Sequence, residues 1–338
     1  MDRPIAQADI ERCRTLVAEI DELARQTGAY ETQRHWHADG GGPVYDPARP
    51  LQPSDVTREF LEDLPSRASF FTGDPPEGTA LNGKGRFLWQ AVRRVSPLLA
   101  ARIIARWWHR LTLPGRHRGP PLVISDKLAA AQMRRLPCFM RPPASFDGTM
   151  LDRIALADRL RALAAAGALP PLRERRSPVV LEIGAGYGGL AFALKHALPR
   201  ATYVIVDLPD SLKLSACYLA TRQRAPIMTV ARLEGMARDG SFLLCPATAI
   251  DRLEVMPIDL AINTLSFGEM SEAQVGRYAA FLRRNLAPDA ALFEQNFDNT
   301  HLGREHFCNP TIVLAQHFSR QRVLSGPYIK GTPRVWSA

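Results

Sequence analysis

Four glycines lie close together in the middle of the chain, at Gly184, Gly186, Gly188 and Gly189. Gly184, Gly186 and Gly189 match the dinucleotide-binding pattern G-x-G-x-x-G, and Asp207 follows about 20 residues on, where an acid binds a ribose hydroxyl. Glycine permits positive φ angles and lets a ligand approach the backbone closely. Glu182 extends the run to E-x-G-x-G-x-G. This spacing predicts a nucleotide-binding loop.

The residues around the loop indicate the elements that must position it. An apolar run over 179–183 is typical of a buried parallel strand, and leucines at helical spacing over 190–198 predict a helix after the glycines. A second β-rich run over 203–206 ends on Asp207. Strand, glycine turn, helix and strand together make half of a nucleotide-binding βαβ unit.

The form E-x-G-x-G-x-G resembles motif I of class I S-adenosylmethionine (SAM) methyltransferases. The resemblance implies that Glu182 helps to hold the methionine end of SAM, that the glycines pass beneath the cofactor, and that Asp207 binds its ribose. The cofactor-binding residues expected on this basis are Glu182, Gly184, Ala185, Gly186, Tyr187, Gly188, Asp207, Leu208 and Asn263. The alternative is a glycine turn in some other α/β protein.

Three longer stretches narrow the resemblance. EIGAGYGGLAFAL, YVIVDLPDSL and INTLSFGEMSEAQVGRY look like a bacterial family of sugar O-methyltransferases, over roughly residues 150–300. Membership would imply transfer of the SAM methyl group to a hydroxyl of a sugar or a glycosylated small molecule. A different hydroxyl acceptor in natural-product tailoring stays open, because function lies in the site that a fold carries.

A weakly acidic sugar hydroxyl calls for a base near the ends of the fourth and fifth strands, and the candidates are Glu269, His301 and His306. The His-Asp pair of some small-molecule O-methyltransferases is absent, since Ser266-Phe267 stands at that place. We favour His301 because imidazole accepts protons near neutral pH. Glu269 is the runner-up, although a carboxylate at a helix N-terminus explains it equally well. Glu294 and Asp298 match no recognised ligand set, so no metal is predicted.

Alternating strand and helix signals from residue 146 onwards predict a Rossmann-like, seven-stranded, mainly parallel α/β sheet. A helix over 150–167 precedes the first strand, and Ser271 with Gln274 resembles a capping box that opens a later helix. Segments 312–324 and 333–336 are expected to supply the last two strands as a hairpin. We divide the chain into a SAM-binding domain, 146–338, and a mostly helical region, 1–145, that serves as a cap, an acceptor side or an oligomer contact.

Composition points to an ordinary soluble protein, with 46% hydrophobic and 23% charged residues. The first residues lack the apolar core of a signal peptide, and no apolar run is long enough to span a membrane. Five scattered cysteines without a CxxC pair predict neither a disulfide framework nor a zinc site. A cytoplasmic location is therefore expected.

The net charge of +9 is concentrated in residues 84–141, which hold 13 Lys and Arg and a single acid, Asp126. Arg102, Arg106 and Arg110 are four apart and so share one face of a predicted helix. That helix could contact a phosphate-bearing partner or an anionic membrane, but packing on the catalytic domain with the arginines in solvent is the first choice.

The same basic segment raises the possibility of an RNA methyltransferase. No aromatic-rich RNA module and no N-P-P-Y motif after the fourth strand accompany it, so we predict no nucleic-acid partner. A SAM-binding subunit without catalysis is a further alternative. The expected partner is a small acceptor containing carbohydrate, and a homo-oligomer is compatible with the sequence.

Overall fold

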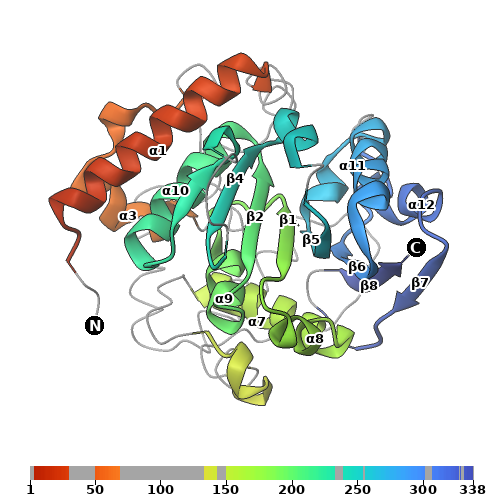
Figure 1. Ribbon diagram of the computed structural model, residues 1–338. Coiled ribbons are helices and arrows are strands. Elements are labelled where there is room, and N and C mark those ends of the chain that lie inside the picture. The colour runs from red at the N-terminus through yellow and green to blue at the C-terminus, as the bar shows by residue number, and fades with distance from the viewer. Residues whose placement is uncertain are drawn as a thin grey trace, which may run out of the picture.

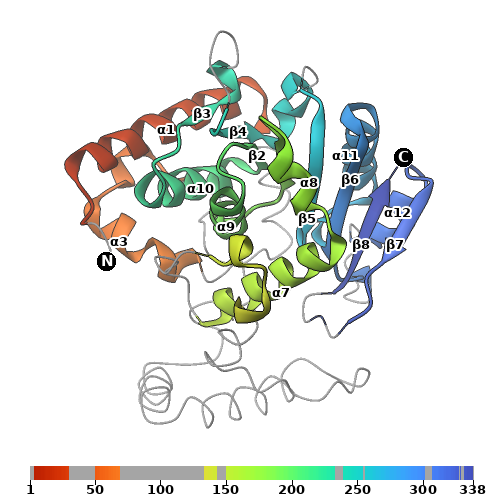
Figure 2. The same ribbon diagram turned by 60° about the horizontal axis from the view of Figure 1, so that its bottom comes forward.

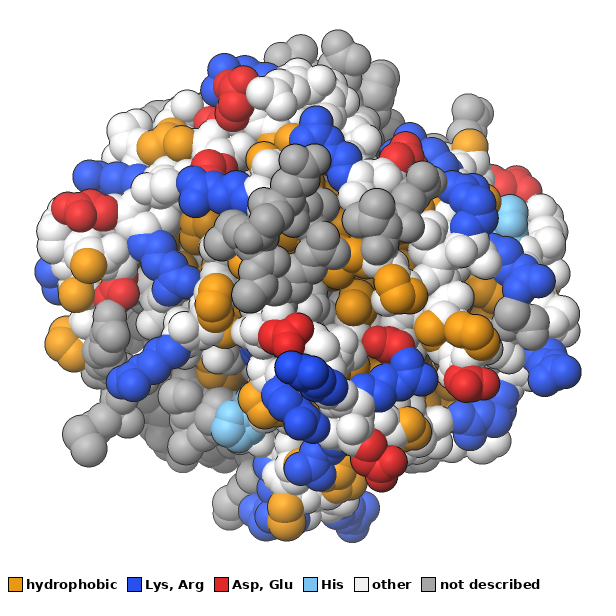
Figure 3. All heavy atoms as spheres, in the orientation of Figure 1, with side chains coloured by type: hydrophobic (Ala, Val, Ile, Leu, Met, Phe, Trp, Pro, Cys, Tyr) orange, Lys and Arg blue, Asp and Glu red, His pale blue; other side chains and the backbone are white. Residues whose placement is uncertain are grey.

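The computed structural model describes residues 4–29, 50–68, 133–142, 150–232, 239–253, 256–300, 307–326, 328 and 331–337. In this part of the chain a single twisted sheet stands at the centre, with helices on both of its faces (Figure 1). The basic helix predicted around Arg102, Arg106 and Arg110 lies outside the described residues. Lys and Arg side chains are spread over the face seen in Figure 3, among hydrophobic and acidic ones.

The described sheet has eight strands: β1 (Val179–Ile183), β2 (Thr202–Asp207), β3 (Ile227–Thr229), β4 (Phe242–Pro246), β5 (Ile258–Thr264), β6 (Leu286–Asn296), β7 (Arg320–Val323) and β8 (Thr332–Ser337). Their order is β3-β4-β2-β1-β5-β6-β8-β7; β8 pairs antiparallel with β6 and β7, and the other described pairs are parallel. From β1 the chain fills one half of the sheet, and from β5 it fills the other. The boundary between β1 and β5 is therefore the topological switch point, where open α/β sheets bind ligands.

Two layers of helices cover the sheet (Figures 1 and 2). One layer contains α7 (Met150–Ala166), α8 (Leu169–Glu174), α9 (Gly189–Ala197) and α10 (Pro209–Arg222). The other contains η5 (Ala247–Leu253), α11 (Glu272–Asn285) and α12 (Pro310–Ala315). Side chains alternate between the two faces along a strand. Tyr203 and Ile205 of β2 therefore enter the core beneath α7, α8, α9 and α10, whereas Val204 and Val206 enter the core beneath η5, α11 and α12. Apolar residues on both faces explain the continuous hydrophobic strands of the sequence.

The described N-terminal residues pack on α10, at the side of the sheet away from α11 and α12 (Figures 1 and 2). They form α1 (Gln7–Gln26), η1 (Pro53–Asp55) and α3 (Arg58–Ala68). Lys213 of α10 is fully buried, forms ion pairs with Asp21 and Asp210, and donates to the Leu51 carbonyl at 2.7 Å. This buried ammonium ties two N-terminal segments to the sheet domain. The division of the chain at residue 145 stays a prediction.

The predicted α/β class with a mainly parallel sheet is confirmed. The final hairpin is present, although the segment predicted to supply its first strand from residue 312 begins within α12, and β7 starts at Arg320. The strand beyond the predicted seven is β3, only three residues long, at the sheet edge. No helix among the described residues is long and apolar enough to cross a membrane.

Candidate functional site

The glycine loop between β1 and α9 lies at the switch point. Gly184, Gly186 and Gly188 have φ angles of 75°, 60° and 89°, a conformation that side chains with a Cβ rarely adopt. A Cβ on Gly184 would lie 2.1 Å from the Ser266 Oγ of the turn after β5. The two sides of the switch point are thus in contact, and only glycine allows this approach.

Asp207, the last residue of β2, holds the loop. Its Oδ2 accepts a hydrogen bond from the Gly186 amide at 2.8 Å, and its Oδ1 accepts one from the Leu208 amide at 2.7 Å. Burial raises the pKa of Asp207 to about 7, against the opposing effect of these backbone donors. The Ala185 amide and the Ser211 side chain also oppose the shift.

Glu182 is buried in β1, on the face covered by α7 and α9. The Tyr203 hydroxyl donates to its Oε2 at 2.8 Å. Burial raises the pKa of Glu182 to about 7, while Tyr203 and the nearby guanidinium of Arg159 on α7 oppose the shift. Arg159 was not predicted as a site residue. Its sequence context does not distinguish it from Arg153 and Arg161 in the same helix.

The other predicted loop residues contribute differently. The side chain of Tyr187 is buried against Tyr218 of α10, with the rings edge to face and their centroids 5.0 Å apart. Ala185 and Leu208 act through their backbone amides, both of which donate to Asp207. Ser215 of α10, which the sequence did not single out, donates to the Gly186 carbonyl at 2.5 Å. The loop is therefore fixed from β2 and from α10.

Asn263, near the end of β5, bridges three strands and is fully buried. Its Nδ2 donates to the Ile183 carbonyl at 2.9 Å and to Ser266 Oγ at 2.6 Å, and its Oδ1 accepts from Asn296 Nδ2 at 2.9 Å. Leu265, two residues on, has φ 71° and ψ −34°, a strained backbone conformation for a leucine. The predicted cofactor role of Asn263 stays a prediction.

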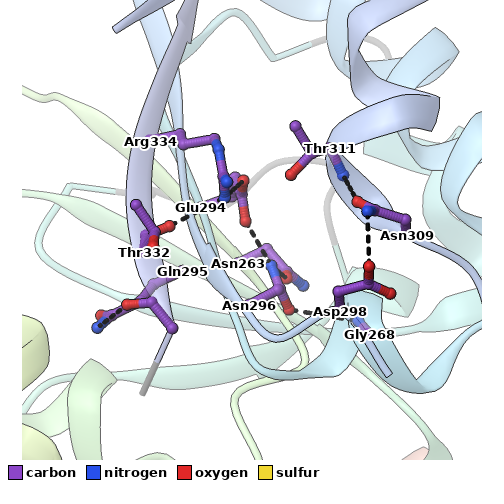
Figure 4. Close-up of polar contacts among 11 residues, drawn as sticks. Asn263, Gly268, Glu294, Gln295, Asn296, Asp298, Asn309, Thr311, Thr332 and Arg334 are labelled. Atoms are coloured by element: carbon purple, nitrogen blue, oxygen red, sulfur yellow. Dashed lines mark hydrogen bonds and ion pairs between the residues drawn. The ribbon is translucent and has the colours of Figure 1, made fainter. Parts of the chain in front are cut away.

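Asn296 also contacts an ion pair between the buried Glu294 and Arg334 (Figure 4). Asn296 Nδ2 also donates to Glu294 Oε2 at 2.8 Å, and the Arg334 guanidinium on β8 donates to Glu294 Oε1 at 3.3 Å. Burial raises the pKa of Glu294, and Asn296 and Arg334 oppose the shift. No group of three or more possible metal-binding side chains occurs within the described residues.

One of the three predicted bases, Glu269, lies among the described residues. Glu269 is exposed in η6 (Ser266–Glu269), the turn between β5 and α11, while His301 and His306 fall outside the described residues. Residues before and after 301–306 are held locally. Asn299 Nδ2 donates to the Gly268 carbonyl at 2.9 Å, and Asn309 Nδ2 donates to Asp298 Oδ2 at 2.9 Å. The catalytic assignments stay predictions.

No family model matches the chain, and no curated protein matches its sequence. Similar solved structures include a precorrin-6y C5,15-methyltransferase from Geobacter metallireducens, at 16% identity over 52% of this chain and 84% of that one, with a TM-score of 0.33. Human Methyltransferase-like protein 13, in complex with SAH, matches at 15% identity over 52% and 78%, with a TM-score of 0.34. A protein assigned as an O-methyltransferase, from Nostoc punctiforme, matches at 15% over 71% and 70%, with a TM-score of 0.36. None of these comparisons supports the sugar-specific family.

Proposed function

We propose that this protein is a SAM-dependent methyltransferase that acts on a hydroxyl of a sugar or a glycosylated small molecule. The observation that carries the proposal is the glycine loop fastened to the Asp207 carboxylate at the switch point of the sheet. SAM, when bound, supplies a methyl group activated by a positively charged sulfur. The sheet order and the two helix layers are those expected of a class I methyltransferase.

The residues around the glycine loop suit such a cofactor. Asp207 stands at the end of β2 beside the loop, where the acid of such a site binds ribose hydroxyls. Glu182 and Arg159 offer one acid and one base side by side, which suits the ammonium and carboxylate of an amino acid. Gly184, Gly186 and Gly188 of the loop have positive φ angles and no side chain, so a ligand can approach the loop backbone closely.

The protein's part in methyl transfer is to bring an acceptor oxygen into line with the methyl group and to remove the hydroxyl proton. The turn after β5 lies beside the glycine loop, and residues after β6 contact that turn. Glu269 or His301 takes the proton. The sugar acceptor is supported by the three sequence stretches that resemble sugar O-methyltransferases.

Calorimetry with SAM, S-adenosylhomocysteine (SAH) and NAD tests the cofactor. We expect binding of SAM and SAH at micromolar strength and none of NAD, and the reverse result would refute the proposal. For the acceptor, the protein is incubated with methyl-labelled SAM and an extract of its own source, and the labelled product is identified by mass spectrometry. A labelled O-methyl sugar supports the proposal, whereas label in RNA or in a product without sugar contradicts the acceptor class.

A further inference from the structure

Arg334, Glu294, Asn296 and Asn263 form a chain of hydrogen bonds whose direction is fixed (Figure 4). A guanidinium can only donate and a carboxylate can only accept. Asn296 must therefore turn its amide nitrogen towards Glu294, and the same nitrogen donates to Asn263 Oδ1. The ion pair at β8 thus decides which way the Asn296 amide points.

The hydrogen bonds of Asn263 agree with this orientation of the Asn296 amide. Asn263 turns its nitrogen to the Ile183 carbonyl, which can only accept, and to Ser266 Oγ. The Ser266 hydroxyl in turn donates to the same carbonyl at 3.2 Å. Asn263 and Glu294 are fully buried and Asn296 nearly so, and a mispaired polar group at such a depth is costly.

The chain of hydrogen bonds ends where the glycine loop meets the turn after β5. Ser266 Oγ lies against Gly184, and the strained Leu265 stands between Ser266 and β5. Asp207, by contrast, fixes the opposite side of the loop, from β2. One set of contacts therefore holds the glycine loop from β2, and a separate set holds it from the turn after β5.

We propose that Glu294 is a positioning residue for the sulfonium and methionine end of the cofactor, acting through Asn296, Asn263 and Ser266. The proposal rests on the function proposed above. Glu294 touches neither cofactor nor acceptor in this scheme. It keeps two amides in the orientation that places the Ser266 hydroxyl beside Gly184.

The test uses two probes that differ at this end. SAM carries a positively charged sulfur and the amino-acid group of methionine. 5′-Methylthioadenosine keeps the adenosine and an uncharged sulfur, but it has neither the positive charge nor the amino-acid group. In Glu294→Gln the side chain keeps its shape, but its new amide nitrogen must face a donor, either Asn296 or Arg334. We expect the Kd for SAM to rise about tenfold, with the Kd for 5′-methylthioadenosine within about twofold of the original.

Rescue separates orientation from simple destabilisation. In Glu294→Gln with Arg334→Met the amide oxygen can again face Asn296, and the amide nitrogen no longer meets a guanidinium. We expect SAM affinity to return to within about threefold of the original protein. Asp259→Asn is the matched control. Asp259 also pairs with an arginine and accepts an N–H, but at the opposite end of β5.

If Glu294→Gln does not fold, Ser266→Ala, at the other end of the hydrogen-bond chain, tests the inference instead. We expect the same selective loss of SAM affinity. Equal changes for both probes, or a lower thermal midpoint with both affinities intact, would show that Glu294 is structural only and would overturn the inference. Failure of the unaltered protein to bind SAM refutes the proposed function instead, before any variant is compared.

Discussion

Asp207→Asn is the sharpest test of the cofactor site because it changes charge and not shape. The carboxylate presents two acceptors to two backbone amides, of Gly186 and Leu208. An asparagine presents one oxygen and one nitrogen, so one amide must face a donor. The proposed ribose contact would also lose its charged acceptor.

The expected loss follows from these contacts. A hydrogen bond to a charged group contributes about 1.5 to 3 kcal/mol, which corresponds to about 10- to 150-fold in Kd. Removing the charge also relieves the cost of burying it, which is the main reason that the pKa of Asp207 is raised. The stability of the cofactor-free protein should therefore change less than its affinity for SAH.

Calorimetry with SAH above pH 7, where the carboxylate is ionised, measures the loss, and thermal unfolding measures stability. Asp259→Asn is again the control, since Asp259 accepts the Val179 amide at 2.7 Å at the far end of the sheet. It should cost stability and leave SAH affinity unchanged. Unchanged SAH affinity in a folded Asp207→Asn variant, or an equal loss in the control, would refute the assignment.

Three further predictions use other contacts of the fold. Gly184→Ala should weaken SAH binding and lower the thermal midpoint because its Cβ meets Ser266 and its φ of 75° strains an alanine, and adding Ser266→Gly should recover part of the thermal midpoint. In urea unfolding, the free energy of unfolding of the cofactor-free protein should fall as pH rises from about 4 to about 7. The raised pKa values of Glu182 and Asp207 let the folded state bind more protons than the unfolded state in this range. A free energy of unfolding that rises over this range would contradict the buried environments of the two carboxyl groups. Lys213→Met should cost about 3 to 5 kcal/mol in urea unfolding by leaving two buried carboxylates without their cation, and a loss below about 1 kcal/mol would show that the ion pairs matter little.

Local features of the fold could be predicted from the sequence. The strand, glycine turn and helix at the site depend on the residues themselves, and β1, α9 and β2 have close to the expected bounds. The capping box at Ser271 is confirmed, with the Gln274 amide donating to Ser271 Oγ at 3.3 Å. These signals lie within a few residues of one another, so they can be recognised without knowing the fold.

Contacts between distant segments could not be predicted in the same way. Asn263 and Asn296 are 33 residues apart and meet because β5 and β6 are paired. Lys213 meets Asp21 through the packing of α1 on α10, which no spacing in the sequence reveals. Asn263 was recognised by its place in a motif, yet the partners that decide its orientation depend on strand register.

The last prediction concerns the base, which we place on His301 with Glu269 as the runner-up. If His301 takes the hydroxyl proton, His301→Ala should lower turnover by roughly two to four orders of magnitude while SAM affinity stays intact. Only neutral imidazole accepts a proton, so the rate should rise with pH through the imidazole pKa. Turnover is measured with the acceptor that the labelling experiment identifies.

Glu269→Gln separates the two candidates because it keeps the shape and removes the carboxylate. Glu269 is exposed, at the end of η6 and three residues before the start of α11. Water already stabilises the charged form of an exposed carboxylate, which makes it a weak base for a sugar hydroxyl, so we expect this variant to keep most of its turnover. Near-normal turnover in His301→Ala with collapse in Glu269→Gln would transfer the role to the glutamate. Near-normal turnover in both would mean that catalysis comes from positioning, and the contacts that fix Ser266 against Gly184 would then be its main source.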